Sequence, residues 1–152
     1  MPDKNDQLSS VLCGIAGEYF VAAELSCRGF VASITLRNTR GIDILATNTD
    51  ASRSVGIQVK TNQGPKAEWI LTQKVESYYS DTLFYIFVNL KGPGQRPDFY
   101  IVPSKEVASF IQADHAAWLS TPGRGGRKHI DNPMRKFRDA QKYLERWELL
   151  PL

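Results

Sequence analysis

The sequence predicts one α/β domain, spanning residues 1–152, in which a mixed central sheet is flanked by helices. Three observations lead to this prediction: a long apolar pattern of helical spacing comes first, three segments of β character follow it, and a continuous apolar run further on is typical of a buried strand. With 152 residues and 42% hydrophobic residues, the chain is long enough to bury its own core. It contains no repeat or linker that would mark a second domain.

The first part of the chain combines one helical segment with three extended ones. Apolar residues recur at helical spacing from Leu12 to Ala22, and Gly29 is suited to end that helix. Branched residues separated by turn clusters then favour strands. The expected elements are a helix from Ser9 or Ser10 to about Arg28, a strand Phe30 to Leu36, a turn Asn38 to Gly41, and a hairpin with strands Ile42 to Thr47 and Val55 to Thr61.

The second part is expected to mix helix and strand and to end in helices. Gly64-Pro65 is expected to interrupt regular structure. Further on, apolar residues from Phe137 to Trp147 recur at helical spacing, and the preceding Asn132 and Pro133 suit the start of a helix. We therefore expect a core over about 9–103 and a helical extension over about 104–152. The expected elements are a helical segment Leu71 to Tyr79, strands Leu83 to Leu90 and Asp98 to Val102, a helix Ser104 to Trp118, a loop Thr121 to Lys128, and a last helix.

Three polar side chains stand among the apolar residues of the expected hairpin. Because side chains alternate across a strand, Gln58 and Lys60 share one face. A hairpin symmetric about its turn sets Asp43 opposite Gln58, with Cβ atoms roughly 4.5 to 5.5 Å apart. A carboxylate, an amide oxygen and the Val59 carbonyl are hard donors that suit Mg²⁺, and a nearby lysine can orient or help deprotonate an attacking water. The alternative is that these are ordinary solvent-facing residues on a strand.

Glu18 lies close to the apolar stripe of the first helix, and here the residues resemble a known family. The sequence resembles the PD-(D/E)XK nuclease superfamily in three successive segments, GEYFVAAELSCRGF, GID and IQVKT. In that family a helix with a glutamate precedes three strands, of which the second carries an aspartate and the third Glu-x-Lys or, in Mrr-like restriction nucleases, Gln-x-Lys. The helix ending in Gly-Phe is also similar to archaeal Holliday-junction resolvases.

The resemblance implies a restriction endonuclease-like core of order α-β-β-β-α-β and hydrolysis of DNA phosphodiester bonds with Mg²⁺, for which Mn²⁺ can substitute. It implies a homodimer. It also implies that Gln58, an amide in place of the usual glutamate, lowers metal affinity. The implied roles are Asp43 as central metal ligand, Gln58 and the Val59 carbonyl as further ligands, Glu18 as an outer ligand through water, Lys60 as catalytic lysine, and Thr61 and Gln73 as helpers.

The net charge of +3 is concentrated in the last quarter of the chain. The candidates for phosphate contacts there are Arg124, Arg127, Lys128, Arg135 and Lys142. A solvated, mobile glycine-rich loop is the alternative for the first three. The leading hypothesis is thus a metal-dependent nuclease, and the alternative is a weak or inactive nuclease-fold module that binds nucleic acid or a protein partner.

Other features favour ordinary structural roles. Cysteines and aromatics are expected in the core, and the histidines lack the spacing of metal ligands. The polar start of the chain and the absence of an apolar run of membrane-spanning length predict a cytoplasmic protein without a membrane partner or an organic cofactor. The residues concerned are Cys13, Cys27, His115, His129, Tyr78, Tyr79, Phe84, Tyr85 and Phe87.

Overall fold

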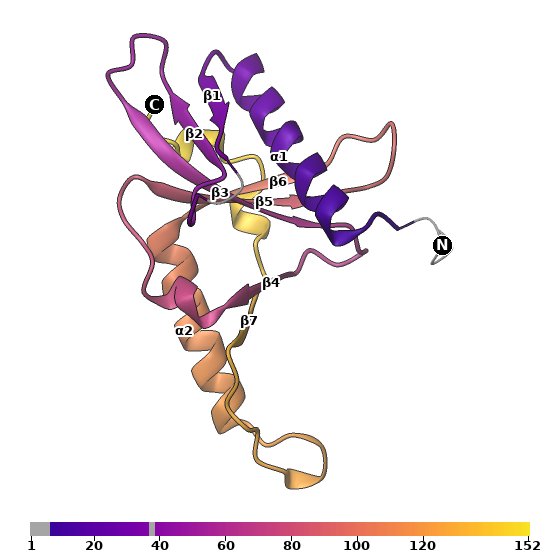
Figure 1. Cartoon of the computed structure of the whole chain (residues 1–152). Coiled ribbons are helices and arrows are strands. Elements are labelled where there is room, and N and C mark those ends of the chain that lie inside the picture. The colour runs from indigo at the N-terminus through magenta and orange to yellow at the C-terminus, as the bar shows by residue number, and fades with distance from the viewer. Residues whose placement is uncertain (1–6, 37–38) are drawn as a thin grey trace.

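A five-stranded mixed sheet forms the centre of the computed structural model, which describes residues 7–36 and 39–152 (Figure 1). Its strand order is β1-β2-β3-β5-β6. Neighbouring strands run antiparallel except for β3 and β5, which are parallel, so the predicted mixed sheet is confirmed. The strands are β1 (Val31–Ile34), β2 (Ile44–Thr47), β3 (Ser54–Asn62), β5 (Leu83–Asn89) and β6 (Asp98–Pro103).

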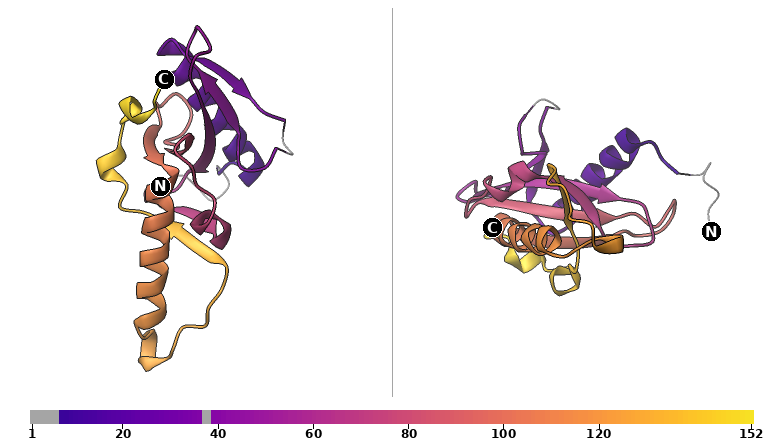
Figure 2. Two further views of the ribbon diagram at one scale, coloured as in Figure 1. Left: turned by 90° about the vertical axis from the view of Figure 1, so that its left-hand side faces the viewer. Right: turned by 90° about the horizontal axis from the view of Figure 1, so that it is seen from below.

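Two helices cover opposite faces of this sheet (Figure 2). The helix α1 (Ser10–Cys27) turns a stripe of four residues toward one face, namely Cys13, Gly17, Val21 and Leu25. The helix α2 (Ser104–Ser120) packs on the other face, against β5 and β6. The part of that second face formed by β2 and β3 is therefore left without a covering helix.

The helix α1 differs in two respects from what the sequence suggested. With a mean hydropathy of 1.3 over 18 residues, it is long and apolar enough by composition to cross a membrane, contrary to our expectation for the chain. In the structure, 22% of these residues are buried, in a stripe that packs against the sheet. Cys13 is buried as expected, whereas Cys27 is exposed and is not part of the core.

A small two-stranded sheet lies beside α2, formed by β4 (Trp69–Thr72) and β7 (Met134–Phe137) in antiparallel pairing. Trp69 fixes it to the main sheet, because its indole N–H donates to the Val88 carbonyl at 3.0 Å and its ring packs on Phe87. The remaining described elements are four 3-10 turns: η2 (Gln73–Glu76), η3 (Arg124–Gly126), η4 (Gln141–Tyr143) and η5 (Trp147–Leu149).

Two expected helices are wrong. The segment Leu71 to Tyr79 contains the end of β4 and the turn η2 instead of a helix. The last helix is replaced by β7 and two 3-10 turns, because the backbone has a φ of 56° at both Asp139 and Glu145, outside the helical region. The start of the expected turn at Asn38 lies outside the described residues.

The contact between α1 and β3 yields a stability prediction. A Cβ at Gly17 would lie 1.8 Å from Thr61 Oγ1 and 2.9 Å from Thr61 Cβ, so no rotamer of Thr61 removes the clash. We expect Gly17→Ala to lower the free energy of unfolding by about 1–3 kcal/mol. Gly14→Ala is the control, because nothing lies within 4 Å of its added Cβ, and it should stabilise by about 0.5–1 kcal/mol.

Urea unfolding of the two variants and the wild type measures both effects. A Gly17→Ala variant as stable as the wild type would contradict the close packing of α1 on β3.

Candidate active site

The candidate site lies where β2 begins and β3 continues beyond it. Ile44 pairs with Ile57, the register that a hairpin symmetric about its turn predicts. One residue before β2, the Asp43 backbone N–H donates to the Ile57 carbonyl at 2.8 Å, and the Asp43 Oδ2 accepts the Val59 N–H at 2.8 Å. The side chain of Asp43 thus takes the place of a backbone partner at the free edge of β3.

Asp43 is in a half-buried position that opposes its ionisation. Burial raises the pKa of its carboxyl above the ordinary value, and this effect exceeds the opposing effects of the Val59 N–H and the Lys60 ammonium. Because Lys60 acts on this pKa, its charge must lie near the carboxylate. The structure therefore brings the predicted acid, the Val59 backbone and the predicted lysine together.

Gln58 and Lys60 lie half-buried on one face of β3, while Val59 between them faces the core. In a strand, the N–H and the carbonyl of one residue point to the same side. Since the Val59 N–H points to Asp43, the Val59 carbonyl also faces this free edge. The oxygen donors at the edge are hard ones, which fit a cation such as Mg²⁺. The described residues contain no group of three His, Cys, Asp or Glu side chains that could hold a metal, so such a site would depend on the Gln58 amide and a backbone carbonyl.

Glu18 lies on α1, half-buried on the face opposite Gln58 and Lys60. The preceding residue, Gly17, packs directly on Thr61, which keeps Glu18 beside the last residues of β3. Of the two expected helpers, Thr61 has its hydroxyl buried without a hydrogen-bond partner among the described residues, and Gln73 is exposed at the start of η2.

Tyr85 is a buried neighbour of the site that the sequence pattern assigned only to the core. It pairs with Gln58 in the register of β3 and β5, and its hydroxyl has no hydrogen-bond partner among the described residues. Burial, helped by Tyr78 and Asp43, raises the pKa of Tyr85 to about 12. The phenol therefore stays protonated at neutral pH and is available as a donor behind the site.

The expected aromatic core is confirmed for three residues and wrong for two. Phe84, Tyr85 and Phe87 are buried, whereas Tyr78 and Tyr79 are 42% and 50% exposed. The position of Tyr78 and Tyr79 could have indicated their exposure, because both precede Ser80 and Asp81 and lie outside the apolar run.

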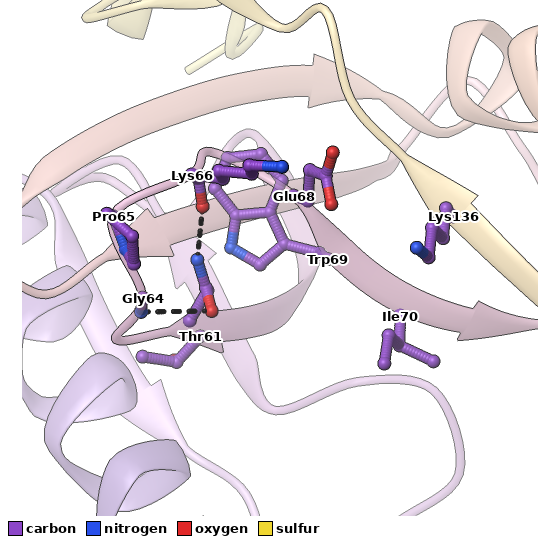
Figure 3. Close-up of a pocket in the computed structure, with 9 residues that line it drawn as sticks. Thr61, Gly64, Pro65, Lys66, Glu68, Trp69, Ile70 and Lys136 are labelled. Carbon is purple, nitrogen blue, oxygen red and sulfur yellow. Dashed lines mark hydrogen bonds between the residues drawn. The ribbon is translucent and has the colours of Figure 1, made fainter. Parts of the chain in front are cut away.

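A cavity of about 410 Å³ lies just beyond Lys60, at the end of β3 (Figure 3). Lys66, Glu68 and Lys136 lie along one side, with Thr61 and Ile70 opposite them. These two lysines were not among the predicted site residues. They add positive charge to the cavity at the end of β3, where Glu68 also lies.

The predicted phosphate-contacting residues fall into three different environments. Arg124, Arg127 and Lys128 are exposed in the loop at the far end of α2 (Figure 1). Arg135 is buried, and its guanidinium donates to the Glu76 carboxylate at 2.7 Å and to neighbouring carbonyls, so it faces inward. Lys142 is exposed on η4, remote from the loop, with its ammonium 5.0 Å from the Tyr143 ring centroid.

The two histidines support this loop. Trp118 stacks between the rings of His115 and His129, with centroid distances of 5.5 and 4.1 Å. His115 Nε2 lies 2.8 Å from Asp131 Oδ1. These contacts give both histidines a packing role, as the sequence favoured.

Comparison with known proteins identifies the fold of this architecture. No family model matches the sequence, and no curated protein matches it. The fold matches that of two solved structures with the restriction endonuclease-like fold.

Two solved structures carry this assignment. The first is Hjc, a Holliday junction resolvase from Archaeoglobus fulgidus, with a TM-score of 0.53, 15% identity, and coverage of 90% of this chain and 94% of that one. The second is the bacterial homing endonuclease I-Ssp6803I, also with a TM-score of 0.53 and 15% identity, covering 94% of this chain and 91% of that one. At this identity the likeness defines the fold.

The raised pKa of Asp43 predicts a pH-dependent stability difference. The native state holds the Asp43 proton more tightly than the unfolded state, so stability from this group falls as pH rises through the raised pKa, and the carboxylate destabilises the protein at neutral pH. Asparagine cannot ionise and keeps an acceptor for the Val59 N–H. We therefore expect Asp43→Asn to be more stable than the wild type at pH 7, with a difference that shrinks as pH falls.

Urea unfolding of both proteins at pH 7 and at a series of lower pH values measures this difference in stability. The substitution Asp50→Asn is the control, because the hydroxyl and N–H of Ser52 lower the pKa of Asp50. Its effect on stability at pH 7 should therefore have the opposite sign. A less stable Asp43→Asn variant at pH 7 would show that the carboxylate is a net stabilising group.

Proposed function

We propose that this protein is a Mg²⁺-dependent endonuclease that hydrolyses DNA phosphodiester bonds. The observation that carries the proposal is the placement of the Asp43 carboxylate against the Val59 N–H at the free edge of β3, with the Lys60 charge beside it. The nuclease folds of the two similar structures support it. Mn²⁺ would serve as a substitute metal.

The residues have distinct roles in this proposal. Asp43, the Gln58 amide and the Val59 carbonyl would hold the metal, with Glu18 contributing through water from the side of α1. The bound metal would polarise the scissile phosphate and lower the pKa of its attacking water. Lys60 would orient that water and balance the negative charge that develops on the phosphate. Because Gln58 is neutral, the site carries one carboxylate fewer than Glu-x-Lys would give, which implies weak metal affinity.

The assembly we propose is a homodimer in the cytoplasm. A single domain of this size contacts only a short stretch of DNA, and two copies would provide two sites for two strands. The homodimer in this proposal rests on the resemblance to PD-(D/E)XK nucleases.

Cleavage assays test the catalytic proposal directly. With Mg²⁺ or Mn²⁺ on plasmid, single-stranded and branched DNA, we expect Asp43→Ala and Lys60→Ala each to lower the rate about 100-fold or more, since each removes a charge that acts on the transition state. Asp50→Ala, in the exposed turn of the same hairpin, and Lys91→Ala, which pairs with Asp98, are matched controls. Activity that survives both site substitutions rules the mechanism out.

The substitution Gln58→Glu extends the same assay to the metal. Restoring a carboxylate should tighten Mn²⁺ binding in isothermal titration calorimetry and raise activity. Unchanged Mn²⁺ affinity would count against a metal site at this position.

A second candidate function is a non-catalytic module that binds nucleic acid or a protein partner. It is favoured by the lack of a three-membered ligand cluster among the described residues and by the exposed basic loop. In this case DNA binding would need the loop and no metal.

Salt titration of DNA affinity in EDTA tests the role of this loop. We expect Arg124→Ala, Arg127→Ala and Lys128→Ala each to reduce the slope of log affinity against log salt by about 0.9, the value for one phosphate contact on duplex DNA. Arg146→Ala is the control, because its guanidinium is paired with Glu148. Slopes unchanged in all three loop variants would remove the loop from the DNA interface.

A further inference from the structure

A second hollow, of about 270 Å³, adjoins the candidate site on the uncovered face of β2 and β3. Its lining includes Leu45 and Gly56, which pair with each other, and the exposed residues Tyr78 and Tyr79. We call this hollow the tyrosine cleft. The tyrosine cleft has no part in the mechanism proposed above.

The tyrosine cleft and the candidate site are neighbours on one face. Gly56, Gln58 and Lys60 alternate onto the same side of β3. Leu83 of β5 pairs with Gly56 and lines the cleft, and Tyr85 pairs with Gln58 beside the site. The cleft is thus one pair of residues along the strands from Asp43, or roughly 7 Å.

The two tyrosines are held on a fixed segment of the chain. Ser104 is fully buried, and its hydroxyl accepts the Ser80 N–H at 3.1 Å and donates to the Ser80 carbonyl at 2.9 Å. The Tyr78 ring lies on Gly41, where a Cβ would come within 2.5 Å of it. Gly41 has a φ of 69°, so glycine both permits this conformation and leaves room for the ring.

The lining of the tyrosine cleft selects one kind of ligand. None of the described residues that line it is charged, and they offer aromatic rings, aliphatic side chains and hydroxyls. A phosphate would find no countercharge there. A nucleobase, with its π-face and hydrogen-bonding edges, matches both the rings and the hydroxyls. The volume falls just below that of sites for drug-sized ligands, which suits a single planar ring system.

We propose that the tyrosine cleft binds an unpaired nucleobase of the DNA strand whose phosphodiester lies at Asp43. This inference rests on the proposed nuclease function and specifies its substrate. A strand advances roughly 3.4 Å per nucleotide when stacked, so the cleft receives a base within one or two nucleotides of the reacting phosphate. Bases in an intact duplex are stacked and paired, so the preferred substrates are single-stranded, bulged or branched DNA.

Binding in EDTA, where cleavage is blocked, tests this inference with 2-aminopurine oligonucleotides and the full chain. We expect the wild type to change the 2-aminopurine fluorescence of single-stranded DNA. Tyr79→Ala and Tyr78→Leu should weaken single-strand affinity about 5- to 100-fold and duplex affinity less than about 2-fold. Tyr79→Phe keeps the ring and should bind like the wild type. Tyr19→Ala, on the exposed side of α1, is the control and should also bind like the wild type.

Three results of the binding assay would overturn the inference: no single-strand binding by the wild type, unchanged affinity in the alanine and leucine variants, or equal losses on single strands and duplex. A changed oligomeric state of these variants in size-exclusion chromatography would assign the cleft to contact with a second copy and would also overturn it. The binding assay in EDTA does not measure cleavage. Failure of the proposed function would instead be seen in the cleavage assay, as activity that does not depend on Asp43.

Discussion

The hydrogen bond from the Val59 N–H to the Asp43 carboxylate determines both the end of the hairpin and the geometry of the candidate site. β3 runs to Asn62, whereas β2 begins only at Ile44, so the edge of β3 past that point needs another partner. The Asp43 side chain supplies it for Val59. The carboxylate is thereby fixed on the strand that carries Gln58 and Lys60. The catalytic geometry we propose thus follows from the requirement that the Val59 N–H have a hydrogen-bond acceptor.

This arrangement requires the carboxylate to remain charged where burial opposes charge. The Val59 N–H and Lys60 offset part of the desolvation, and a bound cation would offset more. A glutamate in place of Gln58 would bring a second negative charge to the same edge, which a bound cation would offset. In the function we propose, the amide would thus lower metal affinity and make the empty site less destabilising, the trade-off expected where function and stability compete.

The hairpin could be predicted from sequence because its register depends on local features: a turn, side-chain alternation and apolar strands. The buried strand β5 was predictable from its continuous apolar run. The end of the chain was not, although Phe137 and Trp147 are buried as their spacing suggested. Asp139 and Glu145 interrupt any helix there with positive φ, and neither is a glycine that would mark such a turn in the sequence. Apolar spacing indicates what is buried, but several backbone paths can bury it.

The exposure of Tyr78 and Tyr79 has a different cause, which lies in the position of α2. This helix packs on β5 and β6, forms one buried cluster with the small sheet around Tyr85 and Phe87, and leaves the β2 and β3 part of the same face uncovered. Aromatic residues close in sequence are therefore divided between core and surface by an element that begins only at Ser104. A helix over β2 and β3 would bury the tyrosine cleft and also close access to Lys60. The accessibility of the candidate site and the existence of the cleft beside it are thus consequences of one packing arrangement.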